Sequence, residues 1–258
     1  MSTQPQTTKA DACVIIPMYN ECENAAAIIE AVLALATPFD ILVIDDNSPD
    51  GTAAIVKKKI EENPGRVDII ERSGKLGLGT AYIEGFRHCV AKGYEFICEM
   101  DADFSHNPSD LERLREAAIS QDADVVVGSR YVTGVNVVNW PMGRILMSFY
   151  ASKYVQLITG LPVHDTTAGF ICYRRRVLEA LPLDHIKFKG YAFQIEMKFT
   201  AYKYGFKVIE VPIIFVNRVL GTSKMNSGIF GEAVFGVVRL KWNSFFTRYP
   251  DYSRKNTL

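Results

Sequence analysis

The sequence of 258 residues lacks an excess of charge of either sign, because 29 Lys and Arg residues balance 29 Asp and Glu residues. Binding of nucleic acid through bulk charge is therefore not expected. The five cysteines form no C-x-x-C pair, so neither a zinc site nor a disulfide framework is predicted. The four histidines show no metal-ligand spacing. The composition is that of an ordinary globular protein, with 48% apolar residues.

The sequence also lacks a run of about 18 apolar residues, so no transmembrane helix is predicted. Residues 1–11 are polar, without the apolar segment of a secretory signal, and we expect a short disordered tail there. Residues 228–258 are expected to form an amphipathic helix and a tail. The apolar run of that helix is interrupted at Glu232, Arg239, Lys241 and Asn243. Such a helix either lies on a membrane or a partner, or closes the core.

Short apolar runs alternate with amphipathic segments over residues 12–130. Strands are predicted at residues 12–16, 41–44, 67–71, 94–100 and 123–127. Helices are predicted from capping boxes at Asn20/Glu23 and Ser109/Glu112, and at residues 50–62 and 80–92. Continuous apolar strands joined by helices are typical of an α/β fold with a mostly parallel sheet covered on both faces. We expect this region to be the nucleotide-binding half.

The region from 131 to 227 is less regular and is expected to complete the same domain, which would span residues 12–227. Predicted elements are a helix at 142–159, a strand at 170–173, a helix at 193–204 and a strand at 207–216, kinked by Pro212. No linker rich in Pro, Gly or Ser separates the halves, so one compact domain is expected.

The most informative feature is the pair Asp101 and Asp103, which ends the fourth predicted strand. In open α/β sheets ligands bind beyond the carboxyl ends of the strands. Two carboxylates there suit a hard cation, and such cations usually bridge to phosphate oxygens. The pattern indicates a nucleotide-diphosphate substrate. The alternative is an acidic helix cap before Pro108.

Polar residues also follow the first two predicted strands. Tyr19 can stack on a base, and Glu21 can accept hydrogen bonds from a base or ribose. Asp45 and Asp46 end the second strand, where an acid is well placed for a ribose hydroxyl or a base amine. The alternative is that these residues only shape turns, and we expect this for one of the two adjacent aspartates.

A glycine-rich stretch, residues 74–80, precedes the third predicted helix. It matches neither the Walker loop nor, by its place after the third strand, the dinucleotide fingerprint. A flexible loop near phosphates remains a hypothesis for it.

Four cations occur later in the chain. These are Arg130, Arg144, Arg218 and Lys224. Arginine forks and lysine charges bind phosphate oxygens, so a second anionic ligand is indicated if the fold brings the four together. Each alone is more typical of a surface or structural residue. Asp165 and Glu196 either orient an acceptor or cap structure.

Several strings occur in an order that resembles one family. They are P-M-Y-N-E at 17–21, I-D-D-N-S-P-D-G-T at 44–52, L-G-L-G-T-A-Y at 76–82, D-A-D-F-S-H-N-P at 101–108, G-S-R-Y at 128–131, T-A-G-F at 167–170, G-Y-A-F-Q-I-E at 190–196 and R-V-L-G-T-S-K at 218–224. Over residues 12–225 the chain resembles the dolichol-phosphate (polyprenol-phosphate) mannose synthases of glycosyltransferase family 2. Each string is weak alone, but the ordered set is specific.

The resemblance implies a GT-A type fold that transfers mannose from GDP-mannose to the phosphate of an isoprenoid lipid, with inversion and with Mg²⁺ or Mn²⁺. It implies a guanosine site at Pro17, Tyr19, Glu21, Ile44 and Asp46. Ribose and diphosphate would meet Asp101, Ala102 and Asp103, and the metal would bind Asp101, Asp103 and Ser105, where some members carry Gln. The phosphates would bind Arg130, Arg218 and Lys224, which with Asp103 form the expected catalytic set. The acceptor would contact Arg130, Arg144 and Ser223.

This chemistry needs no strong general base, because a lipid phosphate is already anionic at neutral pH; neutralisation and positioning supply the rest. The chain resembles the short members without transmembrane helices. Membrane contact is then expected through an amphipathic segment or a small membrane-anchor subunit, at the cytosolic face of the membrane. Residues 142–161, with Trp140 before them, either lie at the lipid interface or form a core helix.

Three other functions stay open. The same fold can use UDP-glucose or another sugar nucleotide on the same lipid. An NAD-dependent oxidoreductase is disfavoured by the misplaced glycine loop, and a catalytically dead sugar-nucleotide-binding subunit by the complete set of acids and cations.

Overall fold

The computed structural model of the chain describes residues 10–188, 190, 192–217 and 228–253. Most of the predicted tail therefore lies outside the described residues. Asp11, the last residue of that tail, is ordered, since its carboxylate accepts hydrogen bonds from Nε and Nη2 of Arg115. None of the described helices is long and apolar enough to cross a bilayer.

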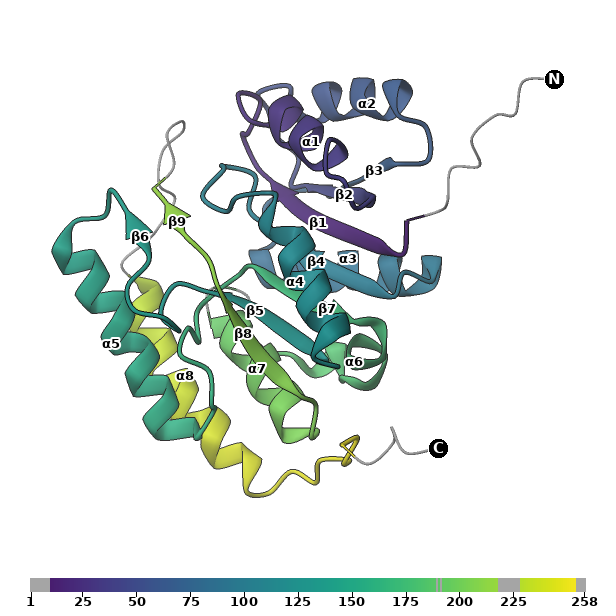
Figure 1. Cartoon of the computed structure of the whole chain (residues 1–258). Helices are drawn as coiled ribbons and strands as arrows, with labels where there is room; N and C mark the ends of the chain where they lie inside the picture. Colours follow the sequence, from purple (N-terminus) through teal and green to yellow (C-terminus); the bar gives the residue numbers. More distant parts are fainter. Residues whose placement is uncertain (1–9, 189, 191, 218–227, 254–258) are drawn as a thin grey trace.

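The centre of the fold is a seven-stranded sheet in the order β3-β2-β1-β4-β7-β5-β8 (Figure 1). Strand β7 is antiparallel to both of its neighbours, and every other pair is parallel. The strands are β1 (Ala12–Met18), β2 (Phe39–Asp45), β3 (Val67–Glu71), β4 (Phe96–Glu99), β5 (Val125–Ser129), β7 (Ile171–Arg174) and β8 (Val208–Pro212). The predicted α/β fold with a mostly parallel sheet is confirmed.

Helices cover both faces of this sheet. The α-helices of the described residues are α1 (Ala25–Leu33), α2 (Thr52–Glu62), α3 (Leu78–Lys92), α4 (Asp110–Ser120), α5 (Met142–Thr159), α6 (Arg175–Ala180), α7 (Ala192–Lys203) and α8 (Gly228–Ser244). Buried side chains of α1, α2 and α4 pack on one face, and those of α3, α6 and α7 pack on the other. Alternate residues of β1 enter the two cores, as the pleat of a strand requires.

Helices α5 and α8 lie side by side outside these layers (Figure 1). They meet α7 through a small cluster centred on Val155, Ile195 and Val237. In α5 the buried residues are Ser152, Val155 and Thr159. Helix α5 is therefore not buried in the core, although Leu161 shortly after it is.

Two predicted capping boxes are wrong. Asn20 has a left-handed backbone with φ +54°, and α1 begins only after Asn24. Ser109 does precede α4, but its side chain makes no capping bond. The carboxylate of Glu112 instead accepts the backbone N–H of Thr37 at 2.6 Å, a long-range contact that competes with the local one.

The predicted strand 207–216 is divided at Pro212, which has no N–H to continue a ladder. Beyond the division, β9 (Phe215–Val216) leaves the main sheet and pairs with β6 (Val137–Val138). Neither this two-stranded sheet nor α6 was predicted. The small sheet carries the chain from β8 toward the carboxyl edge of the main sheet.

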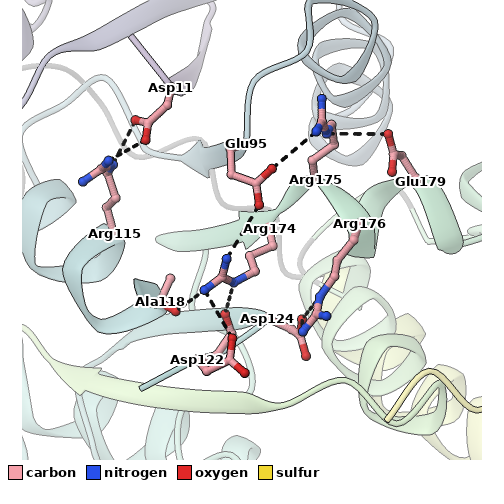
Figure 2. Close-up of polar contacts among 11 residues, drawn as sticks. Asp11, Glu95, Arg115, Ala118, Asp122, Asp124, Arg174, Arg175, Arg176 and Glu179 are labelled. Atoms are coloured by element: carbon pink, nitrogen blue, oxygen red, sulfur yellow. Dashed lines mark hydrogen bonds and ion pairs between the residues drawn. The ribbon is translucent and has the colours of Figure 1, made fainter. Parts of the chain in front are cut away.

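The amino edge of the sheet holds a cluster of ion pairs (Figure 2). The triplet Arg174, Arg175 and Arg176 lies there because β7 is antiparallel and ends where its neighbours begin. Acids that precede β4 and β5, or lie near them, pair with this triplet: Glu95, Asp122, Asp124 and Glu179. These arginines therefore stabilise the fold, and the cations of a phosphate site must come from elsewhere.

Asp124→Ala is expected to destabilise the protein. The Asp124 carboxylate is nearly buried and accepts hydrogen bonds from Arg176 and from the backbone N–H of Lys207 at 2.9 Å. Its loss leaves partly buried donors unpaired and should lower the unfolding free energy by about 1–3 kcal/mol, several degrees in melting temperature. The control Asp184→Ala removes an exposed carboxylate paired with Arg87 and should change the melting temperature little. Equal shifts in the two variants would contradict the assignment.

Candidate active site

Three neighbouring strands end together at the carboxyl edge. Met18 lies opposite Asp45 in the β1–β2 register, and the N–H of Asp46 donates to the carbonyl of Met18 at 3.0 Å. On the other side of β1, the N–H of Met100 donates to the carbonyl of Ile15 at 3.1 Å. The segments that begin at Tyr19, Asp46 and Asp101 therefore leave the sheet at the same edge, as the sequence predicted.

The two adjacent aspartates have different environments. Asp45 accepts the N–H and the hydroxyl of Ser48, at 3.0 and 2.6 Å, and so shapes the turn. Asp46 instead accepts Nη1 of Arg72 at 2.8 Å. Burial raises the pKa of Asp46, and the charge of Arg72 opposes that shift. Asp45 is thus the member of the pair that shapes the turn, whereas Asp46 pairs with a cation from the neighbouring strand end.

Arg72 was not identified from the sequence. It directly follows β3, its side chain is 3% exposed, and it also donates to Thr80 Oγ1 at 2.5 Å. Glu71 lies opposite Asp45 in the β2–β3 register. Arg72, one residue beyond the end of β3, therefore reaches Asp46, one residue beyond the end of β2. These matching positions after adjacent strands are the sequence signal that could have identified Arg72.

The glycine-rich stretch lies beside the residues that follow β1. The Nζ of Lys75 lies 4.9 Å from the ring centroid of Tyr19. Gly77 has φ +106°, which favours glycine. At Gly79 a Cβ would come within 2.7 Å of the Phe193 ring, so this glycine is required for the packing of α3 on α7. Backbone conformation therefore accounts for Gly77, and close packing accounts for Gly79.

Three of the residues implied in donor binding have little surface to offer. Ile44 is wholly buried in the core, and Ala102 is 4% exposed. Pro17 is half-buried within β1. Contacts of Ile44 with a nucleotide would have to be indirect, through the strand that carries Asp46.

Asp101 and Asp103 are not helix caps, because α4 begins only at Asp110. The Asp101 side chain is 45% exposed, whereas Asp103 is buried and its Oδ1 accepts the N–H of Ser105 at 3.1 Å. Between them and Ser105, Phe104 has a left-handed backbone with φ +56°. The acids therefore lie in a tight turn at the end of the strand, as a ligand site requires.

The donor set fits a hard cation. Carboxylate and hydroxyl oxygens are suitable ligands, and the buried Ser105 Oγ has no hydrogen-bond partner among the described residues. In the described part of the chain no group of three or more His, Cys, Asp or Glu side chains surrounds a metal position. Asp101, Asp103 and Ser105 therefore suit a cation such as Mg²⁺, which usually takes one or two carboxylates and completes its shell with substrate oxygens and water.

His106 follows directly and is buried. Burial lowers the pKa of His106 to about 4, so the imidazole is neutral at neutral pH. Its Nδ1 accepts the backbone N–H of Asp101 at 3.4 Å.

Arg130, beyond β5, is held by Asp165. Its Nε and Nη2 each donate to this carboxylate at 2.6 Å, and Nη2 also donates to Thr167 Oγ1 at 3.0 Å. Burial would raise the pKa of Asp165, but the charge and hydrogen bonds of Arg130 outweigh it and lower the pKa. Asp165 therefore acts on the site through Arg130.

Arg144 and Arg130 both lie close to the ring of Trp140. Its guanidinium carbon is 3.9 Å from the centroid of Trp140, and that of Arg130 is 5.5 Å away from the same ring. Nη1 of Arg144 donates to Asn217 Oδ1 at 3.2 Å. The fold thus brings two of the four predicted cations together. Arg218, Ser223 and Lys224 lie outside the described residues.

A buried polar network includes Glu99, two residues before Asp101 and the acidic turn (residues 101–105). Gln194 donates to the Glu99 carboxylate, and Lys198 Nζ donates to the carbonyl of Ala168 at 2.7 Å. Burial raises the pKa of Glu99 to about 8 and lowers the pKa of Lys198 to about 8. Glu196 is a structural residue, since it accepts the N–H groups of Lys187 and Phe188.

Glu99→Gln is expected to flatten the pH dependence of stability. Between the ordinary pKa of 4.5 and about 8, the unfolded chain releases the Glu99 proton while the folded protein keeps it. The contribution of Glu99 to stability is therefore full below about pH 4.5 and is lost as pH rises toward 8. Urea unfolding from pH 5 to 8 should show a steeper decline for wild type than for the variant, with Glu61→Gln as the exposed-carboxylate control. Parallel profiles of wild type and Glu99→Gln would refute this.

The fold and the site define a glycosyltransferase of the GT-A type. The chain belongs to glycosyltransferase family 2, because the model of that family, "Glycosyl transferase family 2", matches residues 13–181. A polyprenol monophosphomannose synthase from Mycolicibacterium smegmatis is 46% identical over 224 residues, 87% of this chain and 84% of that protein. An undecaprenyl-phosphate mannosyltransferase from Micrococcus luteus is 46% identical over 225 residues, 87% and 91% of the two chains.

Solved structures share the fold at lower identity. A glucosyl-3-phosphoglycerate synthase from Mycobacterium tuberculosis, in complex with Mn²⁺, UDP and glucosyl-3-phosphoglycerate, has a TM-score of 0.64 at 16% identity over 95% of this chain and 82% of that one. A mannosyltransferase from Pyrobaculum calidifontis, in complex with GDP-Man and Mn²⁺, has a TM-score of 0.58 at 18% identity over 95% and 67%. The expected GT-A type fold and family are thereby confirmed.

Proposed function

We propose that this enzyme transfers mannose from GDP-mannose to the phosphate of a polyprenyl or dolichyl lipid, with inversion at the sugar and with a divalent cation. The observation that carries the proposal is the 46% identity, over 87% of the chain, to relatives named as a polyprenol monophosphomannose synthase and an undecaprenyl-phosphate mannosyltransferase. The arrangement of acids and cations at the carboxyl edge is consistent with it.

On the donor side, Tyr19, Glu21 and Asp46 would bind the guanosine, and Asp101 and Asp103 the diphosphate region. A cation held by these two acids and Ser105 would neutralise charge on the departing GDP. The chain's own contribution is a rigid edge, since each acid follows a strand that is fixed by its neighbours in the sheet.

On the acceptor side, Arg130 and Arg144 would bind the lipid phosphate, together with Arg218, Ser223 and Lys224 beyond the described residues. The phosphate is anionic already, so its oxygen attacks without removal of a proton. Arg130 is pre-oriented by Asp165 and needs little reorganisation at the moment of reaction.

The test is transfer of labelled sugar to a polyprenyl phosphate in detergent, with GDP-mannose or UDP-glucose as donor and with Mg²⁺, Mn²⁺ or EDTA. Transfer from GDP-mannose that EDTA abolishes would support the proposal, and the anomer of the product would establish inversion. Transfer from UDP-glucose alone would assign the sister activity instead. Wild-type protein that binds neither donor would contradict both.

Asp101→Asn and Asp103→Asn should each lower turnover by on the order of a hundredfold or more, because each removes charge from the proposed cation site. Their melting temperatures should stay close to that of wild type, and the exposed exchange Asp184→Asn is the matched control. Lipid binding should change far less than turnover. Full activity of both variants would exclude the metal assignment.

We further propose that α5 and α8 meet the membrane, at its cytosolic face. Exposed apolar side chains form one stripe on each helix or directly after it: Met142, Leu146, Tyr150 and Leu157, and Phe235, Val238, Trp242, Phe245 and Phe246. Basic side chains accompany them, and Lys241 lies 5.4 Å from the ring of Phe245. Aromatic and basic residues together are typical of interfacial helices.

The double variant Trp242→Ser/Phe245→Ser should bind vesicles of phosphatidylethanolamine and phosphatidylglycerol at least tenfold more weakly, because each exposed ring contributes apolar burial in the bilayer. Activity on a short-chain acceptor in detergent should persist. Ile119→Ser, on α4, is the control for an exposed apolar residue elsewhere. Binding to the vesicles is measured by flotation. Unchanged flotation of the double variant would contradict direct contact between α8 and the membrane and would favour a small membrane-anchor subunit.

A further inference from the structure

His106 occupies a position that its neighbours define closely. Its ring is stacked on Phe170 at a centroid distance of 4.8 Å and an interplanar angle of 13°. Phe215 approaches its edge at 5.2 Å and 81°. The residue is 4% exposed. The imidazole is thus held between one ring that precedes β7 and one ring of β9.

The same imidazole contacts Asp101, the first residue of the acidic turn. Nδ1 accepts the backbone N–H of Asp101 at 3.4 Å and lies 3.9 Å from Oδ2 of that residue. Asp103, Arg130 and Asp165 are close enough to influence the pKa of the imidazole electrostatically. The His106 side chain therefore contacts the first residue of the turn and lies within electrostatic range of groups proposed for both substrates.

The turn needs such support. Phe104 adopts a left-handed backbone, which costs a residue with a side chain on the order of 1 kcal/mol or more and persists only where the surroundings enforce it. Two contacts hold the far end of the turn: Ser105 N–H to Asp103 Oδ1, and Val216 N–H to the Ser105 carbonyl at 3.1 Å. The Asp101 N–H is the near end, and its acceptor is His106.

Strand β9 depends on the same contacts. Val216 bonds to the turn, whereas Phe215 contacts the His106 ring and also packs against Trp140 at 5.2 Å. Arg218 comes two residues after Val216 in the sequence. Displacement of the imidazole would therefore disturb the acids of the donor side and the strand that leads to an acceptor-side cation.

We propose that His106 is a positioning residue: it holds Asp101 and Asp103 in their ligand-binding arrangement and ties the acidic turn to β9. The inference extends the proposed function, because it assigns the group that orients the acids rather than a group that touches substrate. Residues that orient metal ligands typically change metal affinity by ten- to a hundredfold when replaced.

Two variants separate the parts of this role. His106→Phe keeps a ring between Phe170 and Phe215 but removes the acceptor for the Asp101 N–H. His106→Asn keeps an acceptor at the position of Nδ1 but removes the ring. His185, an exposed histidine, provides matched controls as His185→Phe and His185→Asn.

The first readout needs no ligand. Hydrogen exchange of a peptide covering residues 100–106 should be about tenfold or more faster in His106→Phe than in wild type, and less so in His106→Asn. Exchange in α2 and β2 should stay unchanged in both variants, which shows that the effect is local. Wild-type exchange in the turn of His106→Phe would overturn the proposal.

The second readout is Mn²⁺ binding in the presence of GDP, measured by titration. His106→Phe should bind Mn²⁺ at least tenfold more weakly and lower kcat more than it raises KM for the donor, with partial recovery in His106→Asn. Equal losses in both variants, with equally lowered melting temperatures, would show a merely structural residue and overturn the proposal. If wild type itself binds no Mn²⁺, the metal-dependent function fails, and the exchange experiment still judges His106.

Discussion

The buried ion pair between Arg130 and Asp165 is the interaction on which the candidate site depends most. It joins the end of β5 to the turn before β7 by two bonds of 2.6 Å, and the backbone N–H of Arg130 adds a third at 3.0 Å. A buried pair of charges is favourable only when its geometry is good and further hydrogen bonds satisfy it. Here Thr167 Oγ1 accepts a further bond from Nη2 of Arg130, and the Asp165 carboxylate accepts the backbone N–H of Arg130. Glu210 holds the backbone of Asp165 by accepting its N–H. These bonds therefore also fix the direction of the guanidinium.

The two edges of the sheet use charge differently. At the amino edge, the arginines of β7 and α6 pair with acids from neighbouring strand ends, and the ion pairs close the fold (Figure 2). At the carboxyl edge, acids follow three adjacent strands, and the charge of Arg72 stabilises the Asp46 carboxylate among them. Acids gathered at one edge make the region suited to a cation or to a ligand that brings one, a role that the amino edge, with its matched charges, does not share.

The sheet and the acidic edge were predictable because both follow from local patterns. Continuous apolar runs mark the parallel strands, and an acid after such a run lies at the carboxyl edge whichever neighbours the strand acquires. Contacts between distant segments were not predictable in the same way. Arg72 and His106 act on the site through residues of other strands or through rings that only the fold brings together. The capping boxes failed for a related reason: Glu112 has a better partner in Thr37, 75 residues away, than in its own helix.

Transfer to an anionic phosphate sets a particular physical demand. The enzyme must bring two anions together, so cations have to be present on both sides of the bond that forms. Ordering a mobile cationic side chain costs free energy that would otherwise favour binding, so cations that are already held in place are preferable. In the proposed reaction Arg130 would meet this demand, because Asp165 already holds its guanidinium, and Arg144 would meet it partly through its contact with Trp140. The acids proposed for the donor side would need equal rigidity, since a displaced carboxylate would alter the position of the diphosphate and of the sugar carbon that is attacked. The aromatic contacts among Trp140, Phe215 and His106 link these two sets of charges. Uncharged rings are suited to that task, because they transmit position by packing without adding a charge that would weaken either site.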